Sequence, residues 1–161
     1  MLGSPLGAEE PADGWFPVEQ PDKGNFDDEE TDPSIWVVFA KSLAEEKFMV
    51  RFPEDPTYQI SSSNALEMTS SKGGEQYRLW VQENGVVADP FEKRLEEVLI
   101  LPDALLISID EPSQDLFYRA DGKWVREHFI STPSHTYLFQ TSSPVSDGKN
   151  HQFFVNSFQL Q

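Results

Sequence analysis

The sequence predicts an α+β domain, an antiparallel β-sheet of about six to eight strands flanked by one to three helices in an α/β/α sandwich. Short segments that alternate apolar and polar residues recur along the chain, as in strands with one buried face. Brief turns rich in glycine, proline and aspartate join these segments, so successive strands should run antiparallel. One segment has clear helical periodicity and has to cover a face of the sheet.

The chain of 161 residues has room for one domain and a tail. Residues 1–33 carry ten acidic residues and one basic residue among several prolines and glycines, which predicts an acidic, disordered tail or linker. Within this segment, the aromatic residues Trp15, Phe16 and Phe26 either dock on a partner or lie loosely on the domain. Residues 34–161 then form a single globular domain.

The first predicted strands are residues 35–39 and 48–52, as a hairpin or as near neighbours. In the second, Phe48, Val50 and Phe52 alternate with more polar positions. Pro53 and Pro56 follow at once, and because proline lacks the N–H that a ladder needs, the strand should stop there in a rigid, extended exit.

The next two strands are predicted at residues 65–70 and 76–82, after a loop at 61–64. Gly73 and Gly74 supply the positive φ that a tight hairpin turn requires. In the second strand of this hairpin, Arg78 and Trp80 should lie on the face opposite to Tyr77, Leu79 and Val81.

The clearest helix is predicted over residues 90–101, because Asp89 is a good N-cap and Pro90 suits the first helical position. Its apolar face should hold the residues at helical spacing Phe91, Leu95, Val98 and Leu99. Four further strands are expected at residues 105–109, 116–119, 123–130 and 135–140, with a compact turn at Asp121-Gly122 between the middle two. The last segment forms a helix or a strand, and we favour a helix over about 147–157.

The net charge of −16 disfavours binding to nucleic acid or to an anionic membrane surface. A basic protein partner, or a simple need for solubility, explains the negative charge better. The chain has no cysteine, so a disulfide and cysteine-based chemistry are excluded. Its longest apolar runs are too short to insert in a membrane, and neither observation places the protein in a compartment.

No pattern in the sequence indicates an enzyme, a cofactor or a metal site. The histidines His128, His135 and His151 have no partner at the spacing of a helical metal site, so each is expected on the surface or in a turn. The acidic run at 27–32 lacks the ligand spacing and central glycine of a calcium loop.

Aromatic residues on the predicted strands are the best candidates for binding. Trp80 and Trp124, with Arg78 and Arg126 on the same strands, would line a ligand groove if both tryptophans belong to one face of the sheet. The alternative, which we favour, is that helices cover both faces and that these tryptophans, like Trp36, belong to the core.

Three motifs in order resemble the PsbP-like fold: the strand and proline turn at residues 47–56, the aromatic strand at 137–139, and the aromatic ending at 153–160. That family includes the photosystem extrinsic subunit, a Ran-binding nuclear import factor and bacterial envelope lipoproteins of unassigned role. The resemblance covers residues 34–161 and implies a sheet between helices and a binding or scaffolding role. The lipidated cysteine of the lipoproteins is missing here.

We therefore expect a non-enzymatic binding or scaffolding module, exported or envelope-associated, and monomeric. Its partner would be a protein, contacted by a sheet face or by the loops at 53–56 and 112–115. The alternative is an acidic cytosolic chaperone or inhibitor of a basic client, which would dimerise and bind in a salt-sensitive way. A hydrolase is a more distant alternative.

Overall fold

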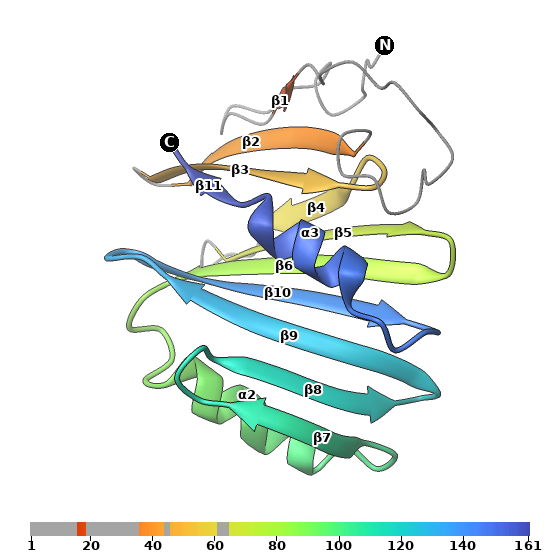
Figure 1. Cartoon of the computed structure of the whole chain (residues 1–161). Coiled ribbons are helices and arrows are strands. Elements are labelled where there is room, and N and C mark those ends of the chain that lie inside the picture. The colour runs from red at the N-terminus through yellow and green to blue at the C-terminus, as the bar shows by residue number, and fades with distance from the viewer. Residues whose placement is uncertain (1–15, 19–35, 44–45, 61–64) are drawn as a thin grey trace.

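The computed structural model describes residues 16–18, 36–43, 46–60 and 65–161 (Figure 1). The described residues form a seven-stranded antiparallel sheet in the order β4-β5-β6-β10-β9-β8-β7 and a smaller sheet in the order β1-β2-β3-β11. Two helices, α2 (Pro90–Leu99) and α3 (Lys149–Asn156), pack against the larger sheet. The predicted α+β class is confirmed.

Most expected elements are present. The strands are β1 (Phe16–Val18), β2 (Val37–Leu43), β3 (Glu46–Phe52), β4 (Thr57–Ile60), β5 (Leu66–Lys72), β6 (Glu75–Glu83), β7 (Leu105–Asp110), β8 (Asp115–Ala120), β9 (Lys123–Ser131), β10 (His135–Ser143) and β11 (Gln159–Leu160). The turn between β5 and β6 contains Gly73 and Gly74, both at positive φ, as predicted. Asp121, at a φ of 56°, and Gly122 form the turn between β8 and β9.

Three strands were not predicted. β1 lies within the segment expected to be a tail and pairs with β2, while the rest of residues 1–33, including Trp15 and Phe26, and the expected loop at 61–64 are outside the described residues. An extended exit was expected after Pro53 and Pro56, but the chain stays in the sheet there: β4 follows Pro56 and pairs with β5. β11 pairs with β3, with Leu160 opposite Phe48. In the described part of the chain, neither helix is long and apolar enough to cross a membrane.

The face of the larger sheet that carries α3, the α3 face, holds the main core. Phe154 of α3 is fully buried and its ring contacts those of Phe52, Tyr77 and Phe139 at centroid distances of 5.3–5.4 Å. The small sheet packs over the same cluster through Phe48 and Phe52. As predicted, the residues of β6 that alternate with Trp80 belong to this core. α3 crosses the strands at the front of Figure 1.

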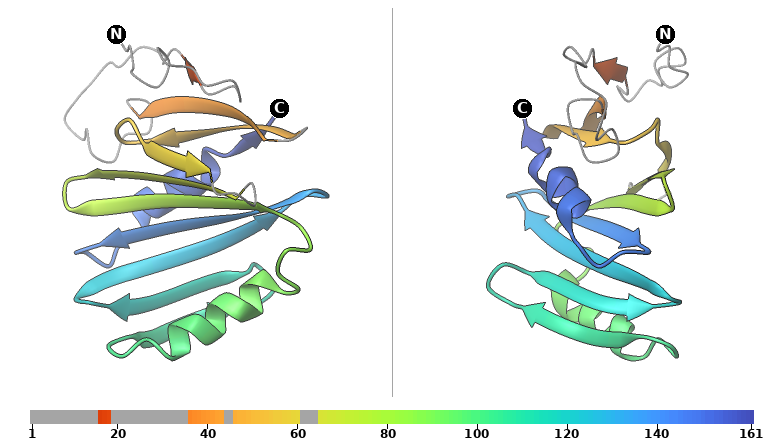
Figure 2. Two further views of the ribbon diagram at one scale, coloured as in Figure 1. Left: turned by 180° about the vertical axis from the view of Figure 1, so that it is seen from behind. Right: turned by 45° about the vertical axis from the view of Figure 1, so that its right-hand side comes forward.

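The opposite face, the α2 face, is only partly covered. α2 begins after Asp89, whose side chain accepts a hydrogen bond from the Glu92 N–H as predicted, and buries Phe91 and Val98 against the strands. Seen from behind, α2 lies over the β7 side of the sheet, and among the described residues no helix crosses the part of this face between α2 and β4 (Figure 2). Leu99 was expected on the buried face but is 60% exposed, because it is turned about 100° from Val98 at the last residue of the helix.

Candidate functional site

A pocket of about 320 Å³ opens on the α2 face, between α2 and strands β6, β9 and β10. Its walls are mainly apolar, with polar groups at the sheet and charged groups on the helix. The lining residues are Trp80, Gln82, Val87, Pro90, Lys93, Arg94, Glu97, Phe129, Thr136 and Leu138.

Strand pairing places the apolar wall. Trp80 of β6 lies opposite Leu138 of β10, which in turn lies opposite Phe129 of β9. Cross-strand partners share a face, so these three side chains form a row that ends under α2. Trp80 is half-buried, and the guanidinium carbon of Arg78 lies 5.7 Å from its ring centroid. Arg78 Nε is buried and has no hydrogen-bond partner in the described structure.

A buried ion pair holds α2 beside the pocket. Arg94 Nε and Nη2 each donate to a carboxylate oxygen of Glu127 at 2.8 Å, in a bidentate arrangement. The Tyr118 hydroxyl and the Gln140 amide donate to the same carboxylate at 2.6 and 2.8 Å. Glu127 is fully buried, but these donors satisfy its oxygens. The pair therefore fixes the helix on the sheet.

The charges in this network shift two pKa values. Burial lowers the pKa of the Arg94 guanidinium, but hydrogen bonds and charge from Glu127 outweigh this, and the net shift is upward. Burial, reinforced by the Glu127 charge, raises the pKa of the Tyr118 hydroxyl. Both groups keep their protons at neutral pH, so the network does not exchange protons with a bound group. The Arg94–Glu127–Tyr118 network therefore has a structural role and holds α2 in place at one side of the pocket.

The four predicted binding residues do not lie on one face. Trp80 and Arg78 are on the α2 face, whereas Trp124 and Arg126 are on the α3 face. The reason is strand alternation. Phe129 shares a face with Trp80, and Trp124 is separated from Phe129 by an odd number of positions along β9, so the Trp124 side chain lies on the opposite face. A single groove lined by both tryptophans is therefore excluded. Trp80 is also outside the buried core, contrary to the alternative that we favoured.

Trp124 and Arg126 form a closed arrangement of their own. Trp124 stacks on Phe117 with ring centroids 5.7 Å apart, and Arg119 lies 4.5 Å from the Trp124 centroid. Arg126 lies 3.8 Å from the Phe117 centroid and donates to the Ser146 carbonyl. The cavity beside them measures about 10 Å³, room for no more than one water molecule. Of the predicted residues, only Trp80 lines a pocket of ligand size.

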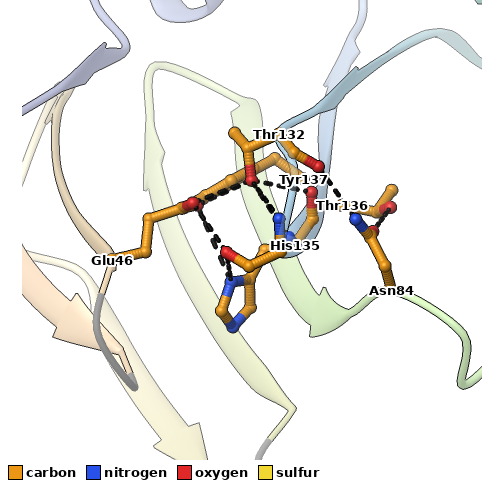
Figure 3. A network of polar contacts seen from close by, with 7 residues as sticks. Glu46, Asn84, Thr132, His135, Thr136 and Tyr137 are labelled. Atoms are coloured by element: carbon orange, nitrogen blue, oxygen red, sulfur yellow. Dashed lines mark hydrogen bonds and ion pairs between the residues drawn. The ribbon is translucent and has the colours of Figure 1, made fainter.

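A second polar cluster joins the two sheets (Figure 3). Glu46, at the start of β3, accepts hydrogen bonds from Thr132, Ser134 and the Tyr137 hydroxyl near the turn between β9 and β10. Asn84 completes the cluster by donating to the Thr132 carbonyl at 2.8 Å. Burial tends to raise the pKa of Glu46, but these hydrogen bonds outweigh it, so the pKa lies below its ordinary value.

This cluster contains a serine, a histidine and a carboxylate, but not the geometry of a nucleophilic triad. Ser134 Oγ lies 2.8 Å from His135 Nδ1, the same ring nitrogen that lies 3.7 Å from Glu46. A triad needs the serine on one ring nitrogen and the carboxylate on the other. His135 Nε2 is buried without a partner in the described residues. The role that its contacts support is structural: the hydrogen bonds to Glu46 connect β3 to β10 and to the turn before it.

Two of the three histidines are not where they were predicted. His135 and His151 are buried, at 2% and 8% exposure, whereas His128 is half-buried and lies 2.7 Å from Asp115. Burial lowers the pKa of His151 to about 3, so its ring is neutral while Nδ1 contacts the Thr141 hydroxyl. In the part of the chain that the structure describes, no three His, Asp or Glu side chains are grouped to hold a metal ion.

Sequence reasoning missed the Arg94–Glu127 pair, although two signals indicated it. Arg94 stands three residues after Phe91 and four before Val98, on the apolar face of the helix. Glu127 alternates in phase with Val125 and Phe129, so it also belongs to an apolar face. A positive and a negative residue at buried positions predict a pair.

Comparison with known proteins finds no matching family, no matching curated protein and no matching solved structure. The resemblance to PsbP-like domains therefore stays a prediction.

Proposed function

We propose that the protein is a non-enzymatic binding module, of the exported or envelope-associated kind that the PsbP-like resemblance implies. In this proposal, an apolar side chain of a protein partner enters the Trp80 pocket. The observation that carries the proposal is a half-buried tryptophan in the wall of an open, mainly apolar pocket on an uncovered part of the sheet.

The size and composition of the pocket favour a side chain over a large cofactor. Its volume of about 320 Å³ lies at the lower end of the range for ligand sites. Aromatic anchors that fill such pockets dominate the energetics of many protein interfaces. At the sheet side, the Gln82 amide can donate or accept a hydrogen bond with the backbone of an inserted segment, and Thr136 Oγ1, which donates its proton to Asn84, can accept one.

The charged residues of the pocket support binding rather than acid–base chemistry, because they are already paired. Lys93 donates to Glu97 at 2.8 Å, and Arg94 is engaged by Glu97 and Glu127. An entering group therefore meets apolar walls, neutral polar groups at the sheet, and charged side chains on the helix that are already paired. We expect an uncharged aromatic or aliphatic side chain to bind there.

The test is a titration with indole and with N-acetylleucinamide, followed by NMR chemical shifts of the Leu138 and Val87 methyl groups. We expect saturable shifts at both residues. Trp80→Ala should weaken binding about tenfold or more, since it removes one wall.

Trp124→Ala is the matched variant on the other face of the sheet. Weakening by Trp124→Ala and not by Trp80→Ala would place the site on the α3 face and contradict the proposal. Shifts spread over the surface without saturation would contradict it as well.

A further inference from the structure

β7 is an edge strand of the larger sheet, and its outer side has no neighbouring strand in the described part of the chain. Three of its four apolar residues, Leu105, Ile107 and Ile109, are 64%, 42% and 42% exposed, whereas Leu106 is half-buried. An edge of this kind presents unpaired backbone groups beside apolar side chains, which is the template for an added strand.

The apolar surface continues from β7 onto the end of α2. Leu99, Ile100 and Leu101 follow one another there and are 60%, 80% and 40% exposed. α2 and β7 pack against each other, and the six residues lie on both sides of the β7 edge, since Ile109 pairs with Leu116 on the α2 face and Leu105 pairs with Arg119 on the α3 face. We call these six residues the β7 corner. Exposed apolar residues gathered in this way mark interaction surfaces in soluble proteins.

The other edge of the same sheet is protected by ordinary means. β4 has four residues and follows Pro56, and its most exposed large apolar side chain is Ile60, at 37%. Natural edges are blunted by short strands, prolines and charged side chains. β7 has some protection of the same kind, a bulge between Leu106 and Ser108 and the charged Asp110 at its end, but it has no proline and no basic residue, and it is two residues longer than β4.

Acidic residues surround the β7 corner. Residues 89–115 contain eight acidic and two basic residues. Both basic residues are paired within this protein, Lys93 with Glu97 and Arg94 with Glu127. Asp103 precedes β7, and Asp110 and Glu111 stand at its end. Arg119 of β8 pairs with Leu105 near Asp103, so the negative charge is concentrated at the end of the strand with Asp110 and Glu111, and an occupant with basic residues there complements it.

We propose that β7 binds an extended, basic segment of another protein as an eighth strand, with apolar side chains of that segment packed on the β7 corner. A second copy of this chain fits poorly. Antiparallel pairing of two β7 strands would place Asp110 and Glu111 of each copy towards Asp103 of the other, and each copy carries a net charge of −16. The acidic residues 1–33 are disfavoured for the same reason.

This surface is distinct from the Trp80 pocket, because none of the six residues of the β7 corner lines that pocket. The two proposals can thus fail independently. The net charge of −16 already favoured a basic protein partner, and this proposal adds the β7 edge as the surface that such a partner contacts.

The experiment uses two sets of ten-residue peptides. In both sets the central residues are Val, Ile, Thr and Leu in varied order. The peptides of one set carry two lysines at each end, and those of the other set carry two glutamates at each end. Binding to the full chain is measured by fluorescence anisotropy at low and high salt, and backbone protection by hydrogen exchange. We expect lysine-flanked peptides to bind, more weakly at high salt, and to protect the amides of β7.

The Leu105→Lys/Ile107→Lys double variant should weaken this binding at least tenfold, since it adds charge to the edge. Ile60→Lys makes the same kind of change on β4 and should leave binding unchanged. Circular dichroism confirms that both variants fold.

Equal binding of glutamate-flanked peptides, equal loss in both variants, or no binding of any lysine-flanked peptide would overturn the proposal. Dimerisation of the wild-type chain that the double variant abolishes would overturn it too, because the occupant would then be a second copy.

Discussion

The two faces of the larger sheet are made from the same strands but are covered to very different extents. On the α3 face, aromatic rings from both sheets and from α3 are packed into one large cluster whose twelve buried members are at most 1% exposed. On the α2 face, a smaller cluster lies under the helix, and beyond it Trp80 stays half-exposed. The contrast indicates that one face supplies most of the stability, which leaves the other free to carry binding.

The largest expected effect comes from Phe154→Ala on the α3 face. Phe154 is fully buried among three aromatic rings, so its loss should lower the free energy of unfolding by about 4 kcal/mol. Trp80→Ala on the α2 face should cost about 1 kcal/mol or less. Urea denaturation measures both. Similar losses in the two variants would contradict the division of roles between the faces.

Arg94→Met should destabilise the protein by about 3 kcal/mol, because it leaves the buried Glu127 carboxylate without its partner. Adding Glu127→Gln removes the uncompensated charge and keeps an acceptor for the Tyr118 hydroxyl, so the double variant should recover part of the loss. Lys93→Met, which breaks an exposed pair on the same helix, is the matched control and should change little. No recovery in the double variant would mean that the unpaired Glu127 carboxylate is not the cause of the loss.

The smallest effect is a pH dependence that originates on the α3 face. Burial lowers the pKa of His151 from 6.5 to about 3, so the unfolded chain takes up a proton below pH 6.5 that the folded chain does not. Stability should then fall with falling pH, by about 2 kcal/mol between about pH 7 and pH 5. His151→Asn should flatten this part of the profile, as measured by urea denaturation at each pH. The Glu46 carboxyl acts in a lower window, since its stabilising effect is lost only below its ordinary pKa of 4.5.

The local parts of this fold could be predicted from the sequence because local chemistry determines them. Gly73 and Gly74 define one hairpin turn, and Asp89 and Pro90 define the start of α2. Alternation also placed Trp80 correctly, opposite to Tyr77 on its own strand.

The relation between distant strands could not be predicted in the same way. Whether Trp80 and Trp124 share a face depends on the pairing of β6 with β10 and of β10 with β9, and no local signal specifies that register. The pocket depends on the same pairings and on the contact of Arg94 with Glu127. The two signals for that contact were present, but only the fold brings the two residues together.

The pairing of Met49 with Gln159 has a consequence for synthesis on the ribosome. β3 emerges early, but its neighbour β11 and the helix α3, whose Phe154 contacts Phe52, are made only after all strands of the larger sheet. β6 likewise cannot pair with β10 until α2 and strands β7 to β9 have also been made. Long-range pairings of this kind slow folding and leave apolar strands exposed meanwhile. The nascent chain therefore holds its aromatic side chains in contact with water, or with a chaperone, until translation has passed residue 159.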